Sequence, residues 1–187
     1  NFPIWGMLEK IAVNLMAGVA AVVKPSEFTS YLTELMVKEI INSKILPEGS
    51  LQLIPGLGRG LLDHVDHRDV VTFTGSASTG KLLKSHANIL DHSVPFNMEA
   101  DSLNACVLGE DVKADSDEFK LFIKEVYKEI TVKTGQKCTA VRRILVPEKM
   151  VDEVQKQLIT KLEETVIGNP DNKDVRMGAL ASKVQVE

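Results

Sequence analysis

Cys138 lies in a short polar segment whose residue types favour a turn over a helix or a strand. Its neighbours are small or polar: Gly135, Gln136, Lys137 and Thr139. Reactive cysteines are partly exposed and often lie near a cation, because the thiolate is the nucleophilic form. Lys137, Arg142 and Arg143 bring positive charge close to Cys138 in the sequence. We therefore expect a nucleophilic thiol, the alternative being a small buried apolar side chain without chemistry.

Glu99 is the candidate partner of that thiol, because it follows an apolar segment and directly precedes a predicted turn. A carboxylate in such a position can act as a general base on water. The alternative is an ordinary solvated glutamate. The four histidines and two cysteines are not spaced as zinc ligands, so we predict no metal site.

Two further segments are placed to bind a ligand. The loop from Gly75 to Gly80, which includes Ser76, follows a predicted strand and opens a predicted helix, an arrangement that can hold a phosphate. Leu82 stands where a P-loop needs Ser or Thr, which disfavours a phosphotransferase. Lys24 and Glu27 follow another apolar strand, at the end where open α/β sheets bind ligands. For both segments the alternative is a structural turn that binds nothing.

Helices and strands that alternate along the chain would position these residues. Periodicity and turn residues predict helices at residues 5–17, 26–43, 60–67, 76–83, 116–133 and 147–166. Short apolar runs predict strands at residues 19–23, 51–54, 70–74, 94–99, 104–108 and 141–146. This alternation indicates an α/β fold with a Rossmann-like parallel sheet.

Composition excludes several classes of function. The 187 residues are 44% hydrophobic and 26% charged, with a net charge of -4 and no basic cluster, so we expect neither a nucleic acid nor a membrane surface as partner. No run approaches the roughly 18 apolar residues of a membrane span. Two separate cysteines favour a reducing, cytoplasmic compartment. The chain begins at Asn1 without an initiating Met, and we expect it to be part of a longer protein.

Taken together, these motifs resemble the aldehyde dehydrogenase family. The matching segments follow the family's order: Asn1-Phe2-Pro3, Lys24-Pro25-Ser26-Glu27, Phe73-Thr74-Gly75-Ser76 with Gly80, Glu99, Gly135-Gln136-Lys137-Cys138-Thr139, and Gly168-Asn169-Pro170 with Met177-Gly178. The resemblance covers essentially the whole chain, but the chain covers less than half of such an enzyme. It implies part of a cofactor domain at residues 1–97 and the first part of an α/β catalytic domain at residues 98–187.

The resemblance also implies a role for each residue. Cys138 would attack the aldehyde, with the Asn1 side chain and the Cys138 N–H stabilising the oxyanion, and Glu99 would activate the water that releases the acid. Lys24 and Glu27 would hold the adenosine ribose of NAD or NADP, and the loop of Gly75, Ser76 and Gly80 would bind the pyrophosphate region. A carboxylate at position 27 favours NAD. Lys24 favours NADP, and so does the resemblance to the semialdehyde-oxidising subgroup described next.

Where most of the family has Glu-Leu-Gly-Gly, this chain reads Glu99-Ala100-Asp101-Ser102-Leu103-Asn104. That variant is similar to a subgroup that oxidises a CoA-linked semialdehyde in phenylacetate catabolism. The resemblance further implies a homo-oligomer when the protein is full length. Two alternatives stay open: a CoA-acylating dehydrogenase, which Glu99 disfavours, and a catalytically incompetent nucleotide-binding remnant or interaction module.

Overall fold

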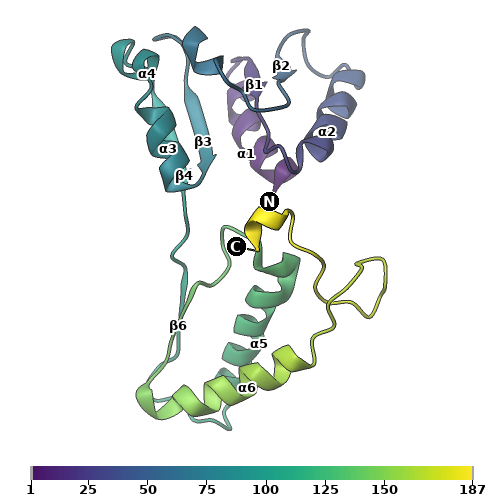
Figure 1. Cartoon of the computed structure of the whole chain (residues 1–187), viewed down its shortest axis with the longest axis vertical. Coiled ribbons are helices and arrows are strands. Elements are labelled where there is room, and N and C mark those ends of the chain that lie inside the picture. Colours follow the sequence, from purple (N-terminus) through teal and green to yellow (C-terminus); the bar gives the residue numbers. More distant parts are fainter. Residues whose placement is uncertain (1, 187) are drawn as a thin grey trace. The chain divides into compact units, whose positions relative to one another are not determined.

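The computed structural model describes residues 2–186, and the chain divides into two compact units, residues 1–101 and 102–187 (Figure 1). Each unit has its own cluster of buried apolar side chains. The boundary expected after residue 97 falls inside a strand, Phe96–Ala100, which belongs to the first unit.

The first unit opens with two helices that flank a pair of parallel strands (Figure 1). Pro3 begins the first helix, a position where its missing N–H costs no hydrogen bond. The elements are α1 (Pro3–Met16), β1 (Ala21–Val23), α2 (Ser30–Asn42) and β2 (Leu51–Leu53). All four contribute to one apolar cluster, formed by Met7, Ile11, Ala21, Val37 and Leu51. The helices and strands predicted for residues 5–54 are therefore confirmed.

A second parallel pair completes this unit, with one longer and two short helical segments. The elements are η1 (Leu61–His64), β3 (Val71–Gly75), α3 (Ala77–Lys84), α4 (Ala87–Asp91) and β4 (Phe96–Ala100). β3 and β4 run parallel, with Thr74 opposite Glu99. Helix α3 packs against both strands. The short α4 has no counterpart among the predicted helices.

The helix predicted at residues 60–67 is wrong, because the chain forms only the short 3-10 turn η1. Asp66 supplies the physical reason. Its carboxylate accepts hydrogen bonds from the backbone N–H and the guanidinium of Arg68, and its own N–H donates to Asp69. Such side-chain to backbone bonds compete with the helical pattern. The hydrogen bond from the Arg68 side chain also holds the pKa of Asp66 well below its usual range.

The second unit packs two long helices beside a third parallel pair. Its elements are β5 (Ala105–Val107), α5 (Asp117–Thr131), η2 (Val132–Gly135), β6 (Arg143–Leu145), η3 (Glu148–Met150), α6 (Val151–Glu163) and η4 (Lys183–Gln185). Asn104 precedes β5, whose first residue, Ala105, lies opposite Arg143 in β6. Further along, Ile167 and Met177 form an isolated parallel bridge.

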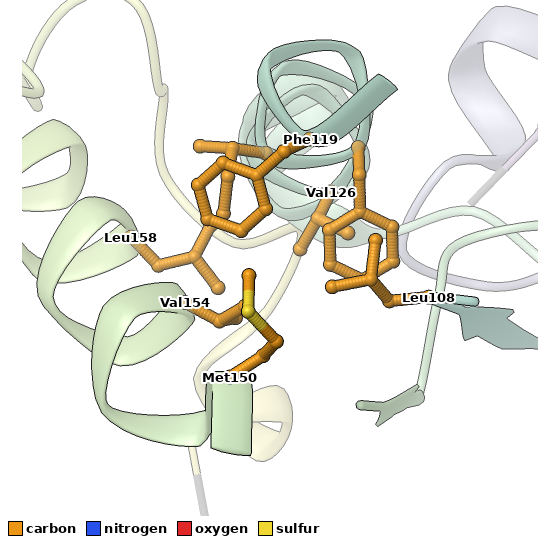
Figure 2. Close-up of a cluster of buried hydrophobic side chains, with 8 residues drawn as sticks. Leu108, Phe119, Val126, Met150, Val154 and Leu158 are labelled. Atoms are coloured by element: carbon orange, nitrogen blue, oxygen red, sulfur yellow. The ribbon is translucent and has the colours of Figure 1, made fainter. Parts of the chain in front are cut away.

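Figure 2 shows the apolar cluster between α5 and α6. The buried members are Leu108, Phe119, Phe122, Ile123, Val126, Met150, Val154 and Leu158. The predicted apolar face of α5 is confirmed, because its regularly spaced side chains supply half of this cluster. Full burial of one such side chain stabilises a fold by about 1.5–3 kcal/mol. The second unit therefore has a core of its own, which can hold the turn between η2 and β6 in place.

The fold class is confirmed, since the strand pairs in residues 2–186 are all parallel and helices connect them. Over the same residues, no helix combines the length and apolar content required to cross a bilayer.

Candidate functional site

Cys138 lies in a turn between η2 and β6 and is exposed to solvent, as the sequence predicted. The chain enters this turn through three consecutive residues with left-handed backbone: Lys133 (φ 53°), Thr134 (φ 57°) and Gly135 (φ 68°). Left-handed conformations cost roughly 1–2 kcal/mol at residues other than glycine. A segment held in this conformation has to be fixed by contacts to the surrounding structure.

Part of that fixation comes from the segment after α6. The Thr134 hydroxyl donates to the carbonyl of Gly178 (3.1 Å), and the Gln136 side-chain oxygen accepts from the Ala181 N–H (2.8 Å). Gly178 belongs to the last of the motifs singled out in the sequence. That motif therefore contacts the segment that leads into Cys138.

Two of the three cations expected around the thiol, Lys137 and Arg142, bind other groups. The Lys137 ammonium forms a largely buried ion pair with Glu129 of α5, with 2.6 Å between Nζ and Oε1. The Arg142 guanidinium donates to the backbone carbonyls of Lys137 (3.1 Å) and Gly135 (3.4 Å). Both cations thus hold the turn in place.

Two polar residues before β5 hold the backbone of Cys138 itself, and neither was among the predicted site residues. The Cys138 carbonyl accepts hydrogen bonds from the Ser102 hydroxyl and from the Asn104 amide, each at 2.7 Å. The Asn104 amide also reaches the carbonyl of Ala140 at 3.2 Å. The sequence signal was the departure from Glu-Leu-Gly-Gly, which puts a hydroxyl at Ser102, two residues before Asn104.

Glu99 lies within β4, with 54% of its side chain exposed. Its carboxylate pairs with Lys10 of α1, with 3.4 Å between Oε2 and Nζ. Lys10 was also missed at the sequence level. The parallel register with β3 fixes the backbone of Glu99, so the carboxylate is presented from a strand rather than from a flexible loop.

The loop between β3 and α3 ends at the N-terminus of α3, which is capped by side chains. The Ser76 hydroxyl caps α3 by accepting from the Thr79 N–H (3.2 Å), and the Asp101 carboxylate accepts from the Ala77 N–H (3.2 Å). Gly75 and Ser76 are exposed at the end of β3. Gly80 is buried, and a methyl group there would overlap the sulfur of Met98 and press on Phe73. Gly80 therefore lets α3 approach the strands closely.

Lys24 and Glu27 follow β1 directly and are both exposed. Their charged groups lie 3.9 Å apart, and the aliphatic part of Lys24 packs beside Gly58, which has left-handed backbone (φ 62°). This pair marks the carboxyl end of the β1–β2 pair, where the sequence predicted a ligand.

Within the first unit the structure thus places Lys24 beside Glu27, and Gly75 and Ser76 beside the end of β4. Cys138 belongs to the second unit, and the Asn1 prediction lies outside the described residues. In the described part of the chain, no group of three or more histidine, cysteine or acidic side chains is arranged to bind a metal ion.

Comparison with known proteins gives consistent matches. Residues 1–187 match the model of the aldehyde dehydrogenase family. The chain is 45% identical over 185 residues to 3,4-dehydroadipyl-CoA semialdehyde dehydrogenase from Aromatoleum evansii, and 31% identical over 191 residues to 3-succinoylsemialdehyde-pyridine dehydrogenase from a Pseudomonas species. These alignments cover 99% and 100% of this chain but 36% and 38% of the relatives.

Among solved structures, betaine aldehyde dehydrogenase from Staphylococcus aureus in complex with NAD+ superposes with a TM-score of 0.85 at 29% identity. The superposition covers 98% of this chain and 35% of the Staphylococcus protein. The chain therefore spans about a third of the length of the proteins it matches. Both the family model and the arrangement of parallel strands and helices lead to one assignment: this chain belongs to the aldehyde dehydrogenase family.

Proposed function

We propose that the protein containing this chain is an NAD(P)-dependent aldehyde dehydrogenase that oxidises a CoA-linked semialdehyde from aromatic, phenylacetate-type catabolism to the acid. The observation that carries the proposal is an exposed Cys138 on a turn that at least five side chains fix. The 45% identity to a 3,4-dehydroadipyl-CoA semialdehyde dehydrogenase supports the substrate class.

In this mechanism the Cys138 thiolate adds to the aldehyde carbon and forms a thiohemiacetal, whose oxyanion is stabilised by the Cys138 N–H and the Asn1 side chain. The oxidised nicotinamide, when bound, supplies the acceptor for the hydride that leaves this carbon. Cys138 then carries the acyl group as a thioester. Glu99 takes a proton from water, the resulting hydroxide attacks the thioester, and the acid leaves as the thiolate is regenerated.

Part of the chain's surface fits a dinucleotide. Lys24 and Glu27 are exposed at the carboxyl end of a parallel pair, as a site for ribose hydroxyls requires. The N-terminus of α3 has fewer free N–H donors for a phosphate, because Asp101 and Ser76 already accept from the N–H groups of Ala77 and Thr79. We therefore assign the ribose contacts to Lys24 and Glu27, and keep Gly75 and Ser76 as the surface that the pyrophosphate approaches. Gly80 would act only by holding α3 in place.

The roles of Cys138 and Glu99 can be tested in the full-length protein from the source gene. Cys138→Ala should abolish aldehyde oxidation, and Glu99→Gln should let an acyl-enzyme accumulate, visible as added mass on the intact protein. Cys106→Ala is the matched control and should keep its turnover. Normal turnover by Cys138→Ala would refute the mechanism, and transfer of the acyl group to free CoA would instead indicate an acylating dehydrogenase.

The Lys24–Glu27 pair is the place to test the choice of cofactor. We propose NADP, as the resemblance to the semialdehyde-oxidising subgroup implies. The Lys24 ammonium would attract a 2'-phosphate, whereas the Glu27 carboxylate would repel it. Lys24→Met should therefore raise KM for NADP+ more than KM for NAD+, and Glu27→Gln should lower KM for NADP+. Equal changes for the two cofactors in both variants would contradict this assignment.

A further inference from the structure

The two backbone carbonyls on either side of the Cys138 N–H and Cα are both held by side chains. The Lys137 carbonyl accepts from Arg142 Nη2 (3.1 Å) and from the Ala140 N–H (3.3 Å). The Cys138 carbonyl accepts from the Ser102 hydroxyl and the Asn104 amide, each at 2.7 Å. The peptide planes before and after Cys138 are thus each held by hydrogen bonds from side chains.

The orientation of the first plane determines where the Cys138 N–H points. A peptide group is planar and trans, so the carbonyl of Lys137 and the N–H of Cys138 point in opposite directions. Holding the carbonyl toward Arg142 therefore directs the N–H away from Arg142. Among residues 2–186, no acceptor binds that N–H. It is left available as a donor.

The two holding residues are themselves linked. The backbone carbonyl of Asn104 accepts from the N–H groups of Arg142 (2.8 Å) and Arg143 (3.1 Å), immediately before β5 and β6 pair. Asn104 and Arg142 therefore project from one hydrogen-bonded junction at the start of a parallel strand pair. This junction therefore helps to position the turn, together with the contacts that Thr134, Gln136 and Lys137 make.

We propose that Asn104 and Arg142, with Ser102 supporting Asn104, are positioning residues that aim the Cys138 N–H at the oxygen of the bound aldehyde. This inference rests on the function proposed above. Donors of an oxyanion site act through preorganisation, so an N–H that is free to rotate loses much of its effect in the transition state. The role is distinct from that of Cys138, because neither side chain needs to touch the substrate.

The chain offers a matched control for Arg142. Arg143 is its neighbour, carries the same charge and is also exposed, but its side chain makes no hydrogen bond or ion pair with the residues the structure describes. In the full-length protein, Arg142→Ala and Asn104→Ala should lower kcat by about 10- to 100-fold, the scale expected of a misplaced catalytic group. KM for the cofactor should stay unchanged, and Arg143→Ala should behave as wild type.

Two readouts separate positioning from mere folding. Added guanidinium ion should restore part of the kcat of Arg142→Ala and none of that of Asn104→Ala. Stopped-flow absorbance should show that the first turnover, which forms the reduced nicotinamide, is slowed in both variants. If either alanine variant does not fold, Arg142→Lys and Asn104→Asp replace it. The first keeps one donor and should retain an intermediate kcat, and the second removes the amide donor and should not.

The outcomes distinguish this inference from the proposed function. If Cys138→Ala still oxidises aldehyde, the proposed function is wrong. If Cys138→Ala is inactive while Arg142→Ala and Asn104→Ala keep the kcat of Arg143→Ala, the positioning role is wrong and the function stands.

Discussion

Asp101 connects the end of β4 to the start of α3 through an unusual backbone conformation. Its φ of 56° is left-handed, its N–H donates to the Gly75 carbonyl (3.3 Å), and its carboxylate accepts from the Ala77 N–H (3.2 Å). Aspartate tolerates this conformation better than most residues, because its short side chain can hydrogen-bond locally. The residue stands where most of the family has glycine, and its carboxylate caps the start of α3.

We predict that Asp101→Ala lowers the free energy of unfolding of the first unit by about 1–2 kcal/mol, the usual cost of a lost cap and of a left-handed alanine. Hydrogen exchange of peptides from this unit, followed by mass spectrometry at increasing urea concentration, reports the change. Asp101→Asn keeps the local hydrogen bonding and should lose less. Equal losses in the two variants would argue against the capping role.

The two cysteines differ in environment and should differ in reactivity. Cys106 is half-buried against the core of the second unit, and burial raises the pKa of its thiol. Because a raised pKa lowers the fraction of thiolate at any given pH, alkylation of Cys106 should need a higher pH than a free thiol does. Cys138 is exposed.

We predict that iodoacetamide at pH 8 modifies Cys138 before Cys106, and that Cys106 reacts only as the pH rises further. Peptide mass spectrometry of samples quenched over time measures both rates. In urea the two cysteines should react alike, which provides the control. Faster modification of Cys106 in the folded protein would contradict the burial assigned to it.

At the residue scale, the sequence predicted that Cys138 lies in exposed, polar surroundings, but it did not predict which residues contact the Cys138 turn. Small and polar neighbours correctly placed Cys138 on an exposed turn. They did not reveal that Lys137 pairs with Glu129, because α5 and the turn meet only after the chain has folded. Asn104 was missed for the same reason, since its target carbonyl lies 34 residues away in the sequence.

At the scale of elements, Gly80 determines how closely α3 can lie on its strands. A methyl group at this position would overlap the Met98 sulfur and come within 3.2 Å of a Phe73 ring carbon. Overpacking of this kind commonly costs about 1–3 kcal/mol. The intrinsic preference of helices for alanine over glycine works in the opposite direction by up to about 1 kcal/mol.

We predict that Gly80→Ala destabilises the first unit by about 1 kcal/mol net, with Met98 shifting to make room. Gly6→Ala is the matched control, because Gly6 also lies within a helix but has no atom within 4 Å of an added methyl group. That change should stabilise the unit by up to about 1 kcal/mol. Hydrogen exchange of peptides from the first unit at increasing urea concentration measures both changes.

Element prediction succeeded where periodicity was long and failed where side chains compete with the backbone. The apolar spacing of α5 identified the residues that reach the core. At residues 60–67 the apolar positions suggested a helix, but Asp66 binds the backbone of Arg68 and the chain turns away. Helix α4 has only five residues, too few for a periodic signal, and its cap is an imidazole, with His86 Nδ1 accepting from the Asn88 N–H.

At the scale of the whole molecule, each unit contains a core and also exposes large apolar side chains. In α1, Trp5, Val13 and Met16 are 70%, 71% and 89% exposed, and on the third strand pair Val107 and Leu145 are 68% and 51% exposed. The sequence indicated the parallel strand pairs, because short apolar runs alternate with helices. It could not show which apolar positions lack a partner, since helical spacing marks a face without revealing what covers it.

Apolar surface of this extent on two-stranded pairs with open edges favours association. We predict that the 187-residue chain alone self-associates at micromolar concentration and binds a hydrophobic dye such as ANS, as measured by sedimentation velocity and fluorescence. The double substitution Val13→Lys, Met16→Lys should weaken both the self-association and the ANS binding, because it places two charges on the exposed part of α1. Glu34→Gln with Glu39→Gln on α2 gives the same change in net charge without removing apolar surface, and should leave ANS binding unchanged. A monodisperse monomer that melts cooperatively and binds no dye would show that these apolar side chains are covered within the chain itself.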